Sequence, residues 1–88
     1  MSAAAPRKAL VKRSVTIAGH ETSIRLEPIF WDGLVAAAQA QSLPLNALIA
    51  RIDAARIEAA EPPNLASAIR VWLYARAVTS RPDEGDAR

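Results

Sequence analysis

The sequence predicts a mainly helical fold with a short antiparallel β-ribbon, and three observations support this prediction. Two runs of alternating polar and apolar residues, at 12–17 and 20–26, have the period of half-buried strands. Two amphipathic segments, starting at 28 and at 44–46, then place apolar residues at helical spacing. A third apolar segment of helical period follows the double proline at 62–63. At 88 residues the chain is expected to hold one domain at most.

The two strand runs fit together as a hairpin with Ala18-Gly19 as its turn, since glycine tolerates positive φ. Alternatively, the first strand, Lys12–Ile17, extends a ribbon formed between two copies of the chain, because one strand alone leaves its N–H and C=O groups without partners. The residues leave both arrangements open. In the hairpin, one face is apolar with Val15, Ile17, Ile24 and Leu26, and the other is polar with Lys12, Ser14, Thr16, Glu21, Ser23 and Arg25.

The first helix is predicted to begin near Pro28, a favourable first-turn residue, and to end near Gln41. The second is predicted to start after Pro44 or at Asn46, a candidate N-cap, and to continue to about Ala59. A third helix, capped by Asn64, is expected to end before Thr79. The buried stripe of the first helix is predicted as Phe30, Leu34, Ala37 and Ala38, with Trp31 beside it, and that of the third as Leu65, Ile69, Trp72, Leu73 and Ala77.

Positive charge is concentrated at the beginning of the chain. Residues 1–25 hold five basic side chains and one carboxylate, whereas residues 26–88 hold six basic and eight acidic ones. This distribution favours a polyanionic partner, although a solvated basic tail has the same composition. We therefore divide the chain into a flexible basic arm (1–11), a domain (12–79) and a polar, disordered tail (80–88).

The composition argues against several classes of protein. There is no cysteine, no apolar run of membrane-spanning length and no signal-peptide pattern, so we expect a cytoplasmic protein without disulfides. His20 is the single histidine, and Asp32, Asp53 and Glu58 show no spacing typical of acid–base catalysis or metal binding. We expect neither an enzyme nor a cofactor. A short chain with few large aromatic residues also favours an obligate oligomer.

The motif ETSIRL at 21–26, the helical segment 28–41 and the motif LPLNALI at 43–49 together resemble the ribbon-helix-helix family of Arc/MetJ-type repressors. The resemblance covers about residues 20–57. The preceding strand, KRSVTI at 12–17, and the third helix lie outside the minimal family core and are similar to a bacterial subgroup of these domains.

The resemblance implies an intertwined homodimer in which two chains share an antiparallel sheet above interlocking helices, with the sheet in the major groove of DNA. It implies base contacts from Glu21, Ser23 and Arg25. It also implies a phosphate site at the start of the second helix, formed by Leu45, Asn46 and Ala47. The positions of Lys12 and Arg13 suggest further phosphate contacts. The function expected is that of a homodimeric transcriptional regulator, a repressor by analogy with the family.

A second hypothesis keeps the fold and the dimer but gives up specific DNA binding. The chain would then be a protein-interaction module, antitoxin-like or an adaptor, which binds a second protein through its third helix. Glu21 favours this alternative, because a carboxylate repels phosphate. The basic N-terminal region opposes it.

Overall fold

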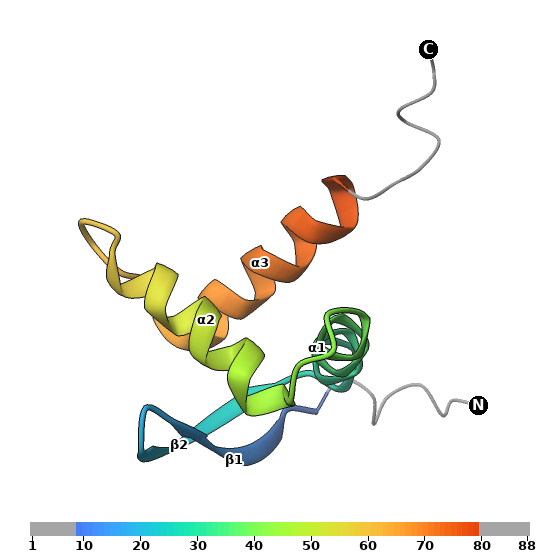
Figure 1. Ribbon diagram of the computed structural model, residues 1–88, viewed down its shortest axis with the longest axis horizontal. Coiled ribbons are helices and arrows are strands. Elements are labelled where there is room, and N and C mark those ends of the chain that lie inside the picture. Colours follow the sequence, from blue (N-terminus) through green and yellow to red (C-terminus); the bar gives the residue numbers. More distant parts are fainter. Residues whose placement is uncertain (1–8, 80–88) are drawn as a thin grey trace.

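Two strands, β1 (Val11–Ile17) and β2 (His20–Leu26), form an antiparallel hairpin at one side of the molecule (Figure 1). The structure, a computed structural model, describes residues 9–79. Pairing runs along the whole length of both strands, from Ile17 opposite His20 to Val11 opposite Leu26. The hairpin is therefore formed within one chain, which is one of the two arrangements that the sequence left open. β1 starts one residue before its predicted beginning.

The turn explains the register. Ala18 and Gly19 both have positive φ, at 52° and 84°, as in a type I′ turn, whose twist matches that of the two strands. A loop of two residues then fixes which side chains share a face. Val15, Ile17, Ile24 and Leu26 are all buried, so the apolar face predicted for the hairpin is confirmed.

The helix α1 (Pro28–Ala40) begins with proline in its first turn, as predicted. Its buried residues are Trp31, Leu34, Ala37 and Ala38. The placement of Phe30 in this stripe was wrong, because Trp31 occupies the position against the sheet and Phe30 is only half-buried. The indole N–H of Trp31 donates a hydrogen bond of 2.9 Å to the carbonyl of Val11, which satisfies its one polar atom in the core.

The helices α2 (Leu45–Ile57) and α3 (Leu65–Thr79) complete the fold, with α2 ending two residues before its predicted end. Asn64 caps α3 as predicted, since its side-chain oxygen accepts a hydrogen bond of 2.8 Å from the amide of Ser67. In α3, Ile69 is fully buried, and Leu65, Trp72 and Leu73 are half-buried, whereas Ala77 is exposed. The predicted stripe is thus correct except at its C-terminal end.

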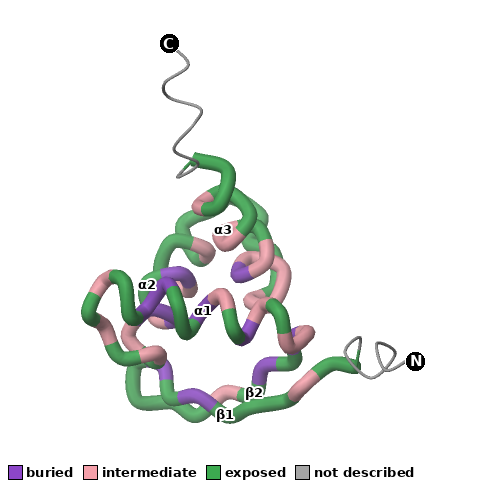
Figure 2. The backbone as a smooth tube through the Cα atoms, turned by 90° about the vertical axis from the view of Figure 1, so that its right-hand side faces the viewer, coloured by how far each residue is buried: buried purple, intermediate pink, exposed green. Residues whose placement is uncertain are grey.

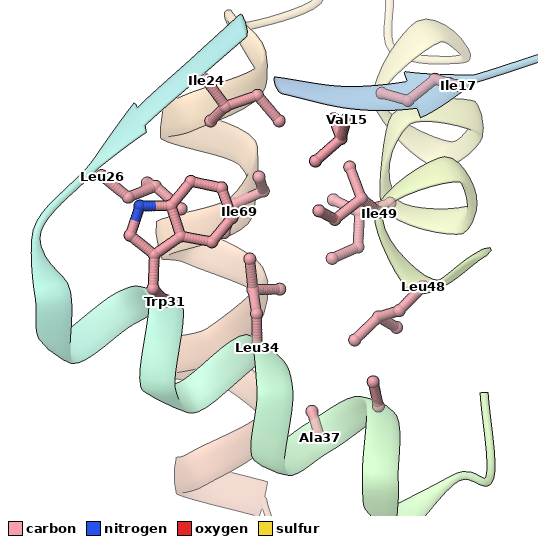
Figure 3. Packing of buried hydrophobic residues seen from close by; sticks show 12 residues of the cluster. Val15, Ile17, Ile24, Leu26, Trp31, Leu34, Ala37, Leu48, Ile49 and Ile69 are labelled. Carbon is pink, nitrogen blue, oxygen red and sulfur yellow. The ribbon is translucent and has the colours of Figure 1, made fainter. Parts of the chain in front are cut away.

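All three helices lie on the same side of the hairpin, and the core fills the space between them (Figures 1 and 2). α2 packs against β1, and α3 packs against β2 and both other helices. Figure 3 shows side chains from every element converging there, and Leu26, Leu34, Ile49 and Ile69 have no exposed surface. The core of one chain is therefore closed by its own third helix. The predicted tail (80–88) and positions 1–8 of the predicted arm lie outside the described residues. Of the remaining arm positions, 9–11, the last one, Val11, is the first residue of β1.

An ion pair fastens α3 to the start of α1. The guanidinium of Arg70 donates two hydrogen bonds, of 3.0 and 3.1 Å, to one carboxylate oxygen of Glu27. The same guanidinium lies 5.7 Å from the centre of the Phe30 ring. Within residues 9–79, no helix is long and apolar enough to cross a membrane.

Candidate nucleic-acid interface

The face of the hairpin that points away from the helices is entirely polar. We call it the outer face; its members are all exposed, and they are Lys12, Ser14 and Thr16 of β1 and Glu21, Ser23 and Arg25 of β2. The strand register sets these side chains in three cross-strand pairs, namely Lys12 with Arg25, Ser14 with Ser23, and Thr16 with Glu21. The three residues predicted to contact bases are thus brought together on one surface. Ser14 and Thr16, for which the sequence suggested no contact, belong to the same surface.

On the outer face, the positive and negative charges lie at opposite ends of the strands. Lys12 and Arg25 lie directly opposite each other at the open end of the hairpin, and Glu21 lies next to the turn. Like charges in this position destabilise a sheet, because the side chains of opposite residues are close. Neither cation takes part in the ion pairs of the described residues, which join Arg56 to Asp53 and Arg70 to Glu27. An anion bound between Lys12 and Arg25 would relieve their repulsion.

Arg13 lies on the opposite side of the sheet from Lys12, because successive residues of a strand point to opposite faces. Its guanidinium is 5.1 Å from the centre of the Trp31 ring, over the rim of the core. This cation–π contact explains how a charged residue is accommodated beside the apolar face. The structure therefore separates Arg13 from the outer face, although the sequence had grouped it with Lys12.

The start of α2 presents free backbone donors. The carbonyl of Pro44 accepts hydrogen bonds from the amides of Ala47 (3.0 Å) and Leu48 (3.2 Å), whereas no backbone acceptor in the described part of the chain engages the amides of Leu45 and Asn46. Free amides at a helix N-terminus, together with the helix dipole, bind anions such as phosphate. Of the three residues predicted for this site, two thus have a free amide.

Of the two predicted starts of α2, the one after Pro44 is confirmed and the one at Asn46 is wrong. The N-cap is Pro44, whose backbone is extended, with φ −63° and ψ 151°, and which makes no side-chain hydrogen bond. Asn46 is instead the second residue of the helix, and its side chain is exposed. A residue that already has helical dihedral angles cannot adopt the extended conformation of a cap. The Asn46 amide group is therefore not used by the fold.

The described residues contain no cluster that suggests a metal site. No three or more of their His, Asp and Glu side chains are grouped so that they could hold a metal ion. His20 is exposed beside the turn. The surface that combines charge, exposure and regular spacing is the outer face of the hairpin.

A family model described as a ribbon-helix-helix domain matches residues 10–77. The match is wider than the resemblance seen in the sequence, since it includes β1 and nearly all of α3. No curated protein and no solved structure matched the chain.

Proposed function

Since the chain belongs to the ribbon-helix-helix family, whose members generally bind DNA as transcription regulators, we propose that it is a sequence-specific DNA-binding protein. In this proposal it acts as a homodimeric transcriptional regulator that inserts its β-ribbon in the major groove. The observation that carries the proposal is the outer face, where Lys12 and Arg25 lie opposite each other with no anionic partner among residues 9–79.

The shape of the hairpin supports this role. The major groove of B-DNA admits a two-stranded β-ribbon, and the hairpin is such a ribbon. Arg25 is suited to donate two parallel hydrogen bonds to guanine, Ser23 suits several bases, and Glu21 is suited to accept from the amino group of cytosine. Lys12 would neutralise a phosphate. Glu21 lies near the turn, four register positions away from the Lys12–Arg25 pair, which keeps its carboxylate at a distance from the cationic end.

Contacts with the backbone of DNA would set the orientation of the ribbon. The free amides of Leu45 and Asn46 supply donors for one phosphate, and the side chain of Asn46 can add a third hydrogen bond. Phosphate contacts of this kind position a protein but carry no sequence information. Specificity in this proposal therefore comes from the outer face, and register from the start of α2.

The test is selection from a pool of random duplexes, with sequencing of the bound fraction and a titration of binding against salt. We expect an enriched motif and an affinity that falls steeply as salt rises. Arg25→Ala should lower discrimination at one base pair by about 1–3 kcal/mol while leaving the protein folded. Arg25→Lys is the matched control, because it keeps the charge but loses the two parallel hydrogen bonds. Undiminished discrimination in both variants would exclude Arg25 as a base contact.

A dimeric protein-interaction module remains the second candidate, and one observation favours it. α3 exposes several large apolar side chains, among them Val71 and Tyr74, on the side away from the core. If the selection yields no motif and only weak binding that depends on salt, the hairpin is a scaffold and this second candidate is preferred.

A further inference from the structure

The two strands of the hairpin carry different chemistry on the outer face. The outer side chains of β1 all donate hydrogen bonds and include no acid; they are Lys12, Ser14 and Thr16. Those of β2 include a carboxylate; they are Glu21, Ser23 and Arg25. Over its whole length β1 holds two cations and no acid, whereas β2 holds one of each. Of the two strands, β1 is thus the better suited to a polyanion.

No helix covers this row of donors. All three helices lie on the other side of the hairpin (Figure 2), and every member of the outer face is exposed. Ser14 and Thr16 are also not needed by the fold, since their hydroxyl groups make no hydrogen bond to any residue in the range 9–79. The hydroxyl groups of β1 are therefore available to a ligand.

Glu21 decides which strand would lie nearer to the phosphates. The major groove is about 12 Å wide, so each of its sugar–phosphate walls lies about 6 Å from its midline. Neighbouring strands are about 4.8 Å apart, so when one strand follows the midline the other lies close to a wall. A carboxylate at the wall would be repelled by the phosphates, and β1 has none. β2 therefore suits the middle of the groove, and β1 suits its wall.

The free edge of β1 adds backbone donors to this row. In a hairpin with a two-residue turn, hydrogen-bonded pairs alternate with non-bonded ones, starting from the bonded pair of Ile17 and His20. The outer residues of β1 all fall in non-bonded pairs, so their amides point away from β2. In the described part of the chain, no backbone hydrogen bond outside the strand ladder engages these amides. Each outer residue of β1 thus offers a phosphate both a side-chain donor and a backbone donor.

We propose that β1 is a phosphate-binding strand, whose outer side chains and edge amides contact the sugar–phosphate backbone at a wall of the major groove, while β2 alone contacts the bases. This inference rests on the proposed function, because it divides the outer face between two kinds of DNA contact. Phosphate contacts position a protein but carry no sequence information, so β1 contributes affinity and β2 contributes specificity. Ser14 and Thr16 thereby have a role as neutral phosphate donors.

A pair of serines provides the matched test. Ser14 and Ser23 lie directly opposite each other, and both are exposed. Each is changed to alanine in the full chain, and binding is measured to the selected duplex and to duplexes that differ from it by one base pair. We expect Ser14→Ala to weaken binding to all of these duplexes by one common factor of about 2- to 10-fold, because one hydrogen bond to the backbone of DNA is lost.

Ser23→Ala should have a different signature. It should lower the discrimination at one or two neighbouring base pairs by a similar factor, and leave the preference at the other positions unchanged. The slope of log affinity against log salt should stay at the wild-type value in both variants, because a hydroxyl group displaces no counterion. Circular dichroism would verify that both variants are folded.

Uncharged phosphate analogues test the contact itself. Single phosphates of the selected duplex are replaced in turn by methylphosphonate, which carries no charge. At the phosphate that Lys12 contacts, the replacement should weaken binding of the wild type. Lys12→Ala has already lost this ion pair, so it should bind the replaced duplex and the unmodified duplex equally.

Unchanged affinity or an altered base preference in Ser14→Ala would overturn the proposal. The same holds for a Lys12→Ala variant that is as sensitive as the wild type to every replacement. If the selection yields no motif, the proposed function fails, and random duplexes still test the strand. Weaker binding of random duplexes by both Ser14→Ala and Lys12→Ala would support its role, and unchanged binding would exclude it.

Discussion

Successive residues of each strand of the hairpin point alternately to its two faces, and these two faces differ in what they contact. On the inner face, Ile24 and Leu26 are buried among side chains of the helices. On the outer face, Lys12 and Arg25 are exposed and have no ion-pair partner among the described residues. Neighbouring residues of one strand thus have different roles. The inner ones stabilise the fold, and in our proposal the outer ones recognise DNA.

Two asparagines near helix starts show the same contrast. Asn64 follows Pro63 and caps α3 by accepting a hydrogen bond from Ser67. Asn46 lies two residues after Pro44, inside α2, and its side chain is exposed. One amide group is used by the fold and the other is free for a ligand. Substitutions at side chains that the fold uses should therefore change the stability, whereas substitutions at side chains that it does not use should change binding.

The largest effect is expected on the inner face. Ile24→Ala should reduce the free energy of unfolding by about 2–5 kcal/mol, because it removes buried methyl groups and leaves a cavity between β2 and the helices. Ser23→Ala, one residue away on the outer face, should change it by no more than about 0.5 kcal/mol. Urea titration followed by circular dichroism would measure both. Equal losses in the two variants would contradict the division between the faces.

The two asparagines should give the next largest difference. Asn64→Ala should reduce the stability by about 1 kcal/mol, since the amide of Ser67 loses its acceptor. Asn46→Ala should leave the stability unchanged and lower the affinity for DNA. Thermal unfolding and a binding titration on the same two proteins would decide the question. A stability loss at Asn46 as large as that at Asn64 would contradict our account of the start of α2.

Lys12→Ala should have two small effects of opposite sign. Without DNA the variant should be more stable by a few tenths of a kcal/mol, because the repulsion with Arg25 is removed. With DNA it should bind more weakly, and the slope of log affinity against log salt should decrease by about one. Thr16→Ala, on the same strand and face, is the control without a charge change. Lower stability of Lys12→Ala in the absence of DNA would contradict the predicted repulsion.

The smallest effect is expected at Glu27, where the ion pair is partly exposed. A backbone hydrogen bond at Glu27 and the side chain of Arg70 together hold the pKa of this carboxyl below its ordinary value of 4.5. A lowered pKa in the folded state means that the ionised group stabilises the fold above pH 4.5, and that this contribution is lost as the pH falls through the folded-state value. Glu27→Gln should therefore be less stable than the wild type near pH 7, and the difference should shrink below pH 4.5. Parallel denaturant titrations at pH 7 and pH 3 would measure it, and a difference independent of pH would contradict the assignment.

Much of the fold was predictable because local rules determine it. The period of two in the strands, the turn at Ala18-Gly19 and the proline at the start of α1 each act over a few residues, and the structure agrees with all three. The choice between Phe30 and Trp31 was not local. Both residues lie near the apolar stripe, and the deciding contact, the hydrogen bond from Trp31 to Val11, spans twenty positions of the chain.

The candidate site shows the same limit. The sequence was sufficient to place Glu21, Ser23 and Arg25 on one face, and the hairpin register set Lys12 opposite Arg25. It did not indicate that Arg13 would stack on Trp31, because that contact depends on how α1 packs against the sheet. The sequence also left the start of α2 open between Pro44 and Asn46, and in the structure Pro44 holds the extended conformation that a capping asparagine would need. The contacts with DNA themselves stay predictions.

The two-residue connection between β1 and β2 also has a consequence for the order of events during folding. Contacts between residues close in the sequence form early, and hairpins arise within about 1–10 μs, although one hairpin alone is only marginally stable. Here the strands meet without a search for another molecule, and the three helices that stabilise them follow on the same polypeptide. A single chain would thus acquire its outer face once its residues 11–79 have folded, before any subunit encounter takes place.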